Sequence, residues 1–208
     1  VIDSTISAWL LTKQGYEVVG IYFDFYPSNQ NSHVKALKEN CQKWGIELLV
    51  NKDYMRFHAT VITPFIEEYL QGRTPSPCTF CNKHMKWQLL LEEADKYNCN
   101  YISTGHYVQK EQRKDTHYLK KAVDAVKDQT YYLWSLDQKV LKKALFPMGS
   151  MTKKETRELA DKLGMNTLST QKESMGVCFL KNINYRDFIY HHASDRIKTI
   201  GMGKAYSA

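Results

Sequence analysis

Two cysteines three positions apart are the residues best suited to chemistry in this sequence. Cys78 and Cys81 lie in the stretch GRTPSPCTFCN (72–82), which runs into a group of basic residues. Pro75 and Pro77 stiffen this loop, because each proline fixes its own φ and restricts the residue before it. We expect a helix to begin just after the pair, so that its N-terminus and the basic residues lower the pKa of the thiols. The loop is predicted to present reactive sulfur.

Three uses of the pair stay open on the residues alone. A Cys-x-x-Cys pair supplies two ligands of a zinc or iron–sulfur site, with His84 as a third, but no second pair in the sequence has zinc-finger spacing. A thioredoxin-like dithiol has the same spacing, yet it opens the first helix after an early strand, whereas this pair follows a long predicted helix. The third use is a nucleophilic cysteine with a helper.

The five cysteines are an odd number in a chain without secretory features, so a disulfide framework is not expected. Cys41 falls on an apolar helix face and Cys99 precedes a buried strand, and we expect both in the core. Cys178, in KESMGVCFL (172–180), fits a small core residue and a functional thiol about equally well.

The ends of two predicted strands carry further candidates, because ligands of open α/β sheets bind beyond the carboxyl ends of the strands. The strand 17–23 ends at Phe23, and the strand 101–104 leads into Gly105 and His106. These positions are candidates for a binding site.

Two helix starts also carry polar residues. Asp3 and Ser4 open the first helix, whose free amide groups and dipole would attract phosphate, although a plain helix cap explains the same residues. The stretch KDQTYYLWSL (127–136) begins with side chains that could contact nucleic acid, while its aromatic residues fit packing. Those side chains are Lys127, Asp128 and Gln129.

Alternating helix and strand patterns position these residues. Apolar runs predict strands, and apolar residues at helical spacing predict helices that end near glycines. Their alternation indicates a doubly wound parallel sheet, so the predicted fold class is α/β. Strands are predicted at 17–23, 46–50 and 101–104, and helices around 6–10, 34–44, 57–69 and 87–94.

Beyond Tyr107 the pattern becomes mostly helical, after a polar loop and a strand at 118–122. The helical patterns span 129–145, 152–163 and 184–192. We therefore expect an α/β domain over residues 1–145 and a smaller, mostly helical, basic region over 146–208.

Composition fits a folded protein with a polyanionic partner. The 208 residues are 43% hydrophobic and 25% charged, enough to bury a core. Lys and Arg (29) exceed Asp and Glu (22), and this net charge of +7 favours a phosphate-rich partner, although a generic basic surface has the same composition. The sequence has neither a membrane-spanning apolar run nor a signal peptide, so we expect a cytoplasmic protein, and we expect a monomer.

Six stretches together resemble one family over nearly the whole chain, the tRNA-specific 2-thiouridylases of the PP-loop ATPase group. VIDS (1–4) resembles the end of the SGGxDS phosphate loop, and GRTPSPCTFCN resembles G-x-T-P-N-P-(D/C)-x-x-C-N. The other four are TGHY (104–107), KDQTYYL (127–133, similar to KDQSYFL), FPMGSMTKKETRELADKLGM (146–165, similar to FPLG-x-x-x-K-x-E-x-R-x-x-A) and KESMGVCF (172–179, similar to KDSxGICF).

The resemblance implies a PP-loop, Rossmann-like fold and ATP-dependent replacement of the C2 oxygen of a tRNA wobble uridine by sulfur. Carbonyl oxygen is a poor leaving group, so the family's reaction first transfers AMP to that oxygen and releases pyrophosphate. The phosphates would lie at the loop before Asp3, with Mg²⁺ assisting.

Two forms of the sulfur step follow from the resemblance. In a persulfide relay, a sulfur-donor protein loads Cys178, and Cys81 is the nucleophile that displaces AMP and then closes a disulfide with Cys178. In a cluster mechanism, Cys78, Cys81 and Cys178 hold a [4Fe–4S] centre. We favour the relay, although many relatives carry Asp where this chain has Cys78.

The resemblance also implies the remaining roles. Asp3 and Ser4 belong to the ATP site, and Phe23 and Gly105 contact adenosine. The expected tRNA contacts are His106, Lys127, Asp128 and Gln129, with Ser76, Pro77 and Cys78 beside the flipped target base.

Departures from the family pattern leave rival functions open. The sequence starts after the family's first strand and Ser-Gly-Gly, and Val1 stands where the family has glycine. The stretch between Phe25 and His33 is short, and TIGMGKAYSA (199–208) only faintly resembles the family's TIGQRKG, with no C-terminal β-barrel after it. The rivals are a non-catalytic RNA- or metal-binding relative and a PP-loop tRNA-adenylating ligase, which would not need Cys178.

Overall fold

The computed structural model describes residues 2–25, 31–165, 176–180 and 183–200. Four parts of the sequence discussed above therefore lie outside the described residues. They are Val1, 26–30 of the stretch between Phe25 and His33, 172–175 of the KESMGVCF stretch and 201–208.

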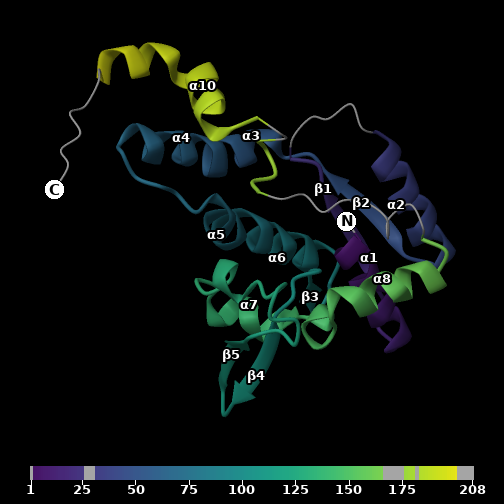
Figure 1. Cartoon of the computed structure of the whole chain (residues 1–208). Helices are drawn as coiled ribbons and strands as arrows, with labels where there is room; N and C mark the ends of the chain where they lie inside the picture. The colour runs from purple at the N-terminus through teal and green to yellow at the C-terminus, as the bar shows by residue number, and fades with distance from the viewer. Residues whose placement is uncertain (1, 26–30, 166–175, 181–182, 201–208) are drawn as a thin grey trace.

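Parallel strand pairs form the centre of the molecule, as predicted. Strand β1 (Val19–Phe23) pairs in parallel with β2 (Glu47–Asn51), with Val19 opposite Glu47, and helix α2 (Asn31–Lys43) makes the crossover. Strand β3 (Ile102–Ser103) pairs in parallel with β6 (Ala144–Leu145). Together with the helices around them, these pairs confirm the α/β class (Figure 1).

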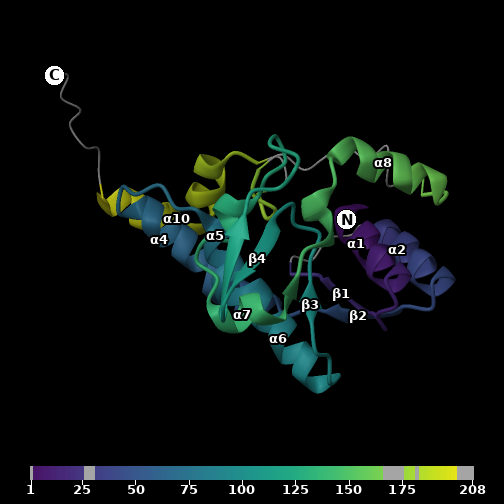
Figure 2. The same ribbon diagram turned by 90° about the horizontal axis from the view of Figure 1, so that it is seen from below.

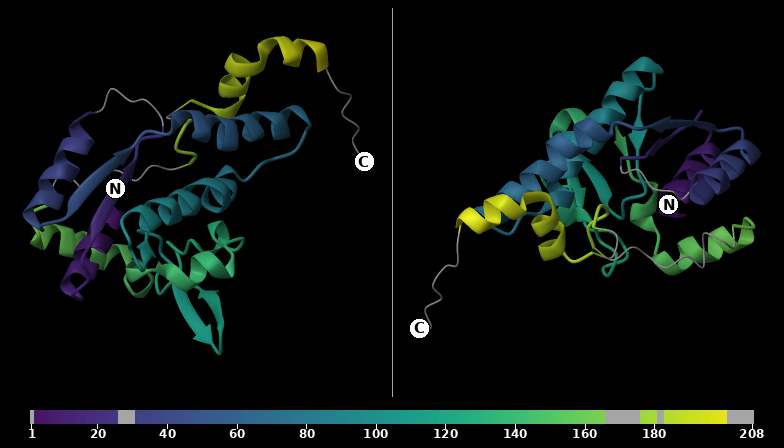
Figure 3. Two further views of the ribbon diagram at one scale, coloured as in Figure 1. Left: turned by 180° about the vertical axis from the view of Figure 1, so that it is seen from behind. Right: turned by 90° about the horizontal axis from the view of Figure 1, so that it is seen from above.

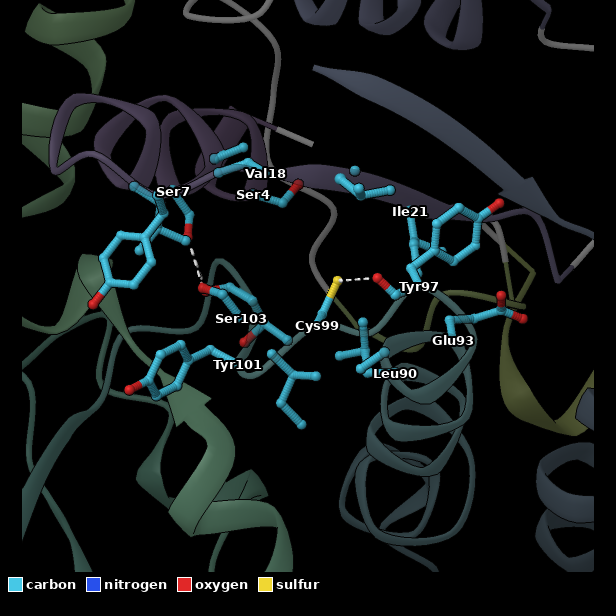
Figure 4. A pocket seen from close by; sticks show the side chains of 18 of the residues that line it. Ser4, Ser7, Val18, Ile21, Leu90, Glu93, Tyr97, Cys99, Tyr101 and Ser103 are labelled. Atoms are coloured by element: carbon cyan, nitrogen blue, oxygen red, sulfur yellow. Dashed lines mark hydrogen bonds between the residues drawn. The ribbon is translucent and has the colours of Figure 1, made fainter. Parts of the chain in front are cut away.

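The two strand pairs are separated by a cavity of about 570 Å³. Its walls are β1 and β3, with helix α1 (Ile2–Lys13) above and α6 (Trp87–Lys96) below. Figure 4 shows Val18 and Ile21 on one side and Tyr101 and Ser103 on the other. In the part of the chain that the structure describes, no strand pairs with the β1 or β3 edge on this side.

Two long helical segments follow β2, and the second begins with the cysteine pair. The first is α3 (Tyr54–Phe57), a π-helical turn η1 (His58–Ile62) and α4 (Thr63–Leu70), and it covers the predicted helix 57–69. The second joins α5 (Pro77–Cys81), a π-helical turn η2 (Asn82–Lys86) and α6. Apolar residues of both segments share a core cluster with α10 (Tyr185–Ile200).

The prediction of one helix over 129–145 is wrong. A hairpin of β4 (Gln109–Arg113) and β5 (Thr116–Lys120) precedes a 3₁₀ turn η3 (Thr130–Tyr132), a short helix α7 (Gln138–Lys143) and β6. Gln129 bonds Tyr107 through both its side-chain oxygen and its backbone amide, which fixes the chain in a non-helical conformation there. Asp137 then caps a new helix by accepting from the Val140 amide.

The last helices pack on the first part of the chain, so a separate second domain is not confirmed. After a 3₁₀ turn η4 (Pro147–Ser150), helix α8 (Lys153–Lys162) lies beside α1, and α10 lies beside α4 (Figures 2 and 3). The predicted helix 152–163 is confirmed, and the predicted helix 184–192 extends further, with a kink at Ala193. No described helix is long and apolar enough to cross a membrane.

Candidate functional site

The cysteine pair lies inside a helix rather than before one. Helix α5 begins at Pro77, with Ser76 as its N-cap residue, and both Cys78 and Cys81 are partly buried. Proline suits this first position because its missing N–H has no partner in a helix start. The Ser76 hydroxyl is 3.0 Å from that of Thr79, which fastens the turn. The structure therefore places the predicted residues 76–78 and 81 on one short helical segment.

The predicted lowering of the thiol pKa values is wrong. Burial raises the pKa of Cys81 to about 11, although the Lys86 cation opposes this rise. Burial also raises the pKa of Cys78. The cause lies in the packing, because Cys81 lies against the apolar cluster of α4, η2 and α10. Both thiols are therefore protonated in this arrangement at neutral pH.

Cys178 approaches the pair from a distant part of the sequence. It is exposed in a turn, and the charge of its thiolate raises the pKa of both Cys78 and Cys81, which places it in their electrostatic neighbourhood. Its neighbour Phe179 is only 2% exposed and packs in the same apolar cluster that Cys81 contacts. The structure thus brings the three cysteines that the sequence singled out into one neighbourhood, and none of the three is in a disulfide.

Asn82 is a residue of this site that sequence reasoning missed. It is 4% exposed, and its side-chain nitrogen donates to the Cys78 carbonyl at 3.0 Å. Its Oδ1 is buried and has no hydrogen-bond partner among the described residues. A buried acceptor without a donor is costly, so it marks a place where a ligand's N–H would be stabilising. The only signal in the sequence was an amide directly after the second cysteine.

A metal does not fit the cysteines as they are arranged here. Within the described ranges, no three His, Cys, Asp or Glu side chains form a group that could hold a metal ion. A [4Fe–4S] centre on Cys78, Cys81 and Cys178 needs such a group, and a protein-held Mg²⁺ would need a comparable set of oxygen ligands.

The start of α1 meets the loop after β3. A Cβ on Gly105 would lie 2.4 Å from the Ser4 nitrogen and 2.6 Å from the Asp3 carbonyl carbon, so only glycine allows this contact. Asp3 does not act as a plain cap, because its Oδ1 receives the Lys153 ammonium at 2.6 Å and the Tyr107 hydroxyl at 2.9 Å. Three of the predicted ATP-site residues therefore lie together.

Phe23, the fourth predicted ATP-site residue, lies elsewhere along the sheet edge. Its ring stacks on Phe25 with centroids 5.0 Å apart, and Phe25 stacks on Phe57 at the same distance. This stack packs against the same apolar cluster as Cys81. Phe23 therefore shares an apolar cluster with Cys81, a contact that the sequence did not indicate.

His106 is buried instead of facing a large ligand. It is 8% exposed, its Nδ1 is 2.6 Å from the Thr104 hydroxyl, and its ring stacks on Trp87. Burial and the nearby Lys86 cation hold its pKa well below the usual value, so the ring is neutral at physiological pH. Its predicted contact with tRNA stays a prediction.

The predicted tRNA residues at 127–129 hold their own loop together. The Asp128 carboxylate accepts from the Ala122 amide at 2.8 Å and from the Thr130 hydroxyl at 2.7 Å. Gln129 is bonded to Tyr107, and Lys127 is partly buried. Next to them the rings of Tyr131 and Trp134 are 68% and 71% exposed, which leaves flat aromatic surfaces available for stacking.

Comparisons with known proteins agree with these features. The family model described as the tRNA methyl transferase HUP domain matches residues 1–182. The tRNA-specific 2-thiouridylase MnmA 3 of Bacteroides fragilis (strain YCH46) is 39% identical over 202 residues, which cover 97% of this chain and 54% of the relative. MnmA 1 of Bacteroides fragilis (strain ATCC 25285) is 40% identical over 188 residues, 90% of this chain and 51% of the relative.

A relative from another organism matches equally well. MnmA 1 of Caldanaerobacter subterraneus subsp. tengcongensis is 39% identical over 212 residues, 95% of this chain and 58% of the relative. The chain thus spans about half the length of the curated relatives that it matches.

Proposed function

The chain belongs to the tRNA methyl transferase HUP-domain family, whose curated relatives are named tRNA-specific 2-thiouridylases, and from this premise we propose that it takes part in ATP-dependent tRNA 2-thiolation. The substrate would be a tRNA uridine whose C2 oxygen is exchanged for sulfur. The single observation that carries the proposal is that Cys81 packs against the apolar cluster in which Phe179, the neighbour of Cys178, is buried, about half of the sequence away.

The first step is the activation of the C2 oxygen. The first turn of α1, with Asp3 and Ser4, would hold the phosphates of ATP, because a helix start offers free amides and a positive dipole. Gly105 would let the loop after β3 approach this turn closely, and it would contact adenosine there. Transfer of AMP to O2 releases pyrophosphate and converts an oxygen that cannot leave into a phosphate ester that can.

Sulfur then replaces the activated oxygen. A donor protein would load Cys178 as a persulfide, whose exposure suits the encounter with another protein. The terminal sulfur attacks C2, and AMP leaves with the former O2. Cys81 next attacks the Cys178 sulfur, which frees the thiocarbonyl and leaves a Cys81–Cys178 disulfide for an external thiol to reduce.

The raised pKa of Cys81 supports this order of events. A thiol that is protonated at neutral pH is a weak nucleophile, so we assign displacement of AMP to the Cys178 persulfide rather than to Cys81. Cys81 would lose its proton to solvent before it attacks the Cys178 sulfur, and the Lys86 cation favours this loss. The unpaired Asn82 Oδ1 beside the pair is a suitable acceptor for the N3–H of a uracil. No step in this scheme uses a metal held by the protein.

The tRNA would reach the cysteines from the side of the exposed aromatic residues after 129. A net charge of +7 favours a nucleic acid partner, and rings such as Tyr131 and Trp134 can stack on unpaired bases. We also propose that residues 146–208 contribute to tRNA binding, that the protein works in the cytoplasm, and that it works there as a monomer.

The gap between β1 and β3 supports the expectation of a further central strand. Parallel strands in one sheet lie about 4.8 Å apart, so two strands that flank one missing partner leave a slot that an extended segment fills. The cavity is lined by both edges and lies directly under α1. We propose that a parallel strand just before α1 occupies this slot, joined to β1 by α1 as a right-handed crossover.

The function is tested by reconstitution. The chain is incubated with ATP, unmodified tRNA and a persulfide donor, and digested tRNA nucleosides are measured by mass spectrometry. We expect 2-thiouridine with the wild type and none with Cys178→Ser, while Cys41→Ser, a change at a buried thiol, still gives product. Product formed at the wild-type rate by Cys178→Ser would reject the proposal.

A further inference from the structure

A partly buried ion pair joins the first turns of α1 and α8. The Lys153 Nζ lies 2.6 Å from Oδ1 of Asp3, and the lysine side chain is 11% exposed while the aspartate side chain is 28% exposed. Lys153 is the first residue of α8, and Asp3 lies in the first turn of α1. Charges withdrawn from water in this way interact more strongly than surface pairs, but each depends on its partner.

Tyr107 is the second donor to Asp3. Its hydroxyl donates to Oδ1 at 2.9 Å and lies 2.8 Å from the Thr156 hydroxyl. The Lys153 ammonium also lies 5.8 Å from the centre of the Tyr107 ring. Tyr107 follows directly on Gly105 and His106, so the same small network touches the loop after β3 and two helices.

Both contacts fall on the same oxygen of Asp3. Its Oδ2 has no hydrogen-bond partner in the parts of the chain that the structure describes, and the side chain keeps some exposure to solvent. The carboxylate is therefore held in one orientation, with one oxygen fixed and the other available at the start of α1.

Contacts at the start of α8 fix the backbone of Lys153. Its backbone amide donates to Asp124 Oδ2 at 2.9 Å, and Thr152 and Glu155 form a capping box around the start of α8. The neighbouring Lys154 differs completely, since it is 87% exposed and pairs with Glu158 only at 3.9 Å. The sequence shows two adjacent lysines, and the structure shows that only Lys153 is buried against Asp3.

We propose that Lys153 is a positioning residue of the nucleotide site, which orients Asp3 and compensates its charge. The inference rests on the proposed function in taking the first turn of α1 as the phosphate site. An uncompensated carboxylate beside that turn would repel the ATP phosphates, whereas a carboxylate paired with a buried ammonium does not. Lys153 acts through Asp3 and does not itself bind phosphate.

Direct titration with a non-hydrolysable ATP analogue tests this role. We expect the Kd to rise on the order of tenfold in Lys153→Met, to recover partly in Lys153→Arg, and to stay at the wild-type value in the matched control Lys154→Met. The tRNA Kd is measured on the same proteins and should rise no more in Lys153→Met than in Lys154→Met, because both lysines lie in the region 146–208 that is proposed to bind tRNA. If the Kd for the analogue rises in Lys153→Met no more than the Kd for tRNA does, or if Lys154→Met weakens analogue binding as much as Lys153→Met, the proposal is overturned.

A double substitution separates positioning from direct contact. If Lys153 acts through Asp3, adding Lys153→Met to Asp3→Asn changes the Kd for the analogue little further, because the carboxylate that it orients is gone. A second loss of about tenfold in that background would mean that Lys153 touches the nucleotide itself, and would overturn the assignment. Tyr107→Phe, which removes only the hydroxyl, should weaken ATP binding less than Lys153→Met.

The outcome for the wild type keeps the two proposals apart. A wild-type chain that binds the analogue but forms no 2-thiouridine overturns the proposed function. The role of Lys153 can then still be tested by analogue binding. A wild-type chain that binds no ATP analogue overturns both.

Discussion

The ring of Phe179 meets the ring of Phe65 edge to face, with centroids 5.1 Å apart and planes at 84°. Phe179 also contacts Phe57 and Phe188, so it is enclosed by aromatic residues of three helices. The exposed thiol of Cys178 is thus attached to one of the most deeply buried side chains in its neighbourhood. This arrangement holds the Cys178 thiol at the surface while the next side chain fixes the backbone.

Loss of the Phe179 ring should destabilise the protein and release Cys178. We expect Phe179→Ala to lower the free energy of unfolding by about 3–5 kcal/mol, because a large buried ring is replaced by a cavity. Phe80→Ala is the control, since Phe80 is 41% exposed, and it should cost less than about 1 kcal/mol. Urea denaturation measures both. Equal losses from the two changes would mean that Phe179 is not the anchor.

Cys81→Ser should abolish 2-thiouridine formation and leave tRNA affinity unchanged. Serine keeps the size of the side chain but cannot attack the Cys178 sulfur, so the thiocarbonyl is not released. The control is Cys99→Ser, a partly exposed thiol at the far end of α6. Nucleoside mass spectrometry and filter binding are the measurements. Normal thiolation by the serine variant would remove Cys81 from the mechanism.

The pH dependence of alkylation should reveal the buried environment of Cys81. Its pKa of about 11 means that the thiolate fraction still rises roughly tenfold per pH unit up to that value. Between about pH 8 and pH 10 its alkylation rate should rise about a hundredfold, against about fourfold for an ordinary thiol with a pKa near 8.5.

The substitution Lys86→Gln tests in which direction the Lys86 charge shifts the pKa of Cys81. The Lys86 cation lowers the pKa of Cys81, so its removal should raise the pKa further and slow alkylation at any pH below it. Peptide mapping after iodoacetamide treatment follows Cys81 separately from the other thiols. A rate that levels off near pH 9 in the folded protein would contradict the burial argument.

The sequence predicted the alternating elements because each relies on local apolar patterns. Strands β1 and β2 and helix α8 lie within a few residues of their predicted bounds. The segment 129–145 could not be predicted in the same way. Its helical pattern is local, whereas the bonds from Gln129 to Tyr107 that break the helix are made across 22 residues.

The site shows the same division between local and distant causes. The strand-end rule pointed to Gly105, whereas the grouping of Gly105 with Asp3 and Ser4, which are in contact in the structure, was implied by the family resemblance. The raised pKa of Cys81 depends on burial by residues far away in the sequence, so the basic neighbours alone indicated the wrong direction. Lys153 became distinct from Lys154 only through its contact with Asp3.

Gly105→Ala should weaken ATP binding. The added Cβ would meet backbone atoms of Ser4 and Asp3 at 2.4 and 2.6 Å, so the loop or the first turn of α1 must move. We expect the KM for ATP to rise about tenfold or more, with a smaller effect on the KM for tRNA. Gly20→Ala is the control, because the nearest atom to its Cβ would be the end of the Leu48 side chain at 3.1 Å, while atoms of Ile46 and Glu47 would lie at an ordinary 3.5 Å. An unchanged KM for ATP in Gly105→Ala would separate this contact from the nucleotide site.

The cavity between β1 and β3 should accept a strand supplied ahead of α1. Each of these strands has one edge without a strand partner in the described part of the chain, and a five-residue apolar segment joined to Val1 by a glycine turn would reach both. We expect this extension to raise the melting temperature and to slow hydrogen exchange of the amides of Val19–Phe23 and of Ile102–Ser103.

The control for the added strand is the same extension with proline at its centre. Proline removes a donor and breaks the ladder, so this version should protect neither strand, although it adds nearly the same apolar surface. The comparison separates strand pairing from simple filling of a hole of about 570 Å³. Equal protection by both extensions would mean that the cavity binds apolar side chains without extending the sheet. In that case the two strand pairs would be separate sheets, and the nucleotide site would depend on α1 and Gly105 alone.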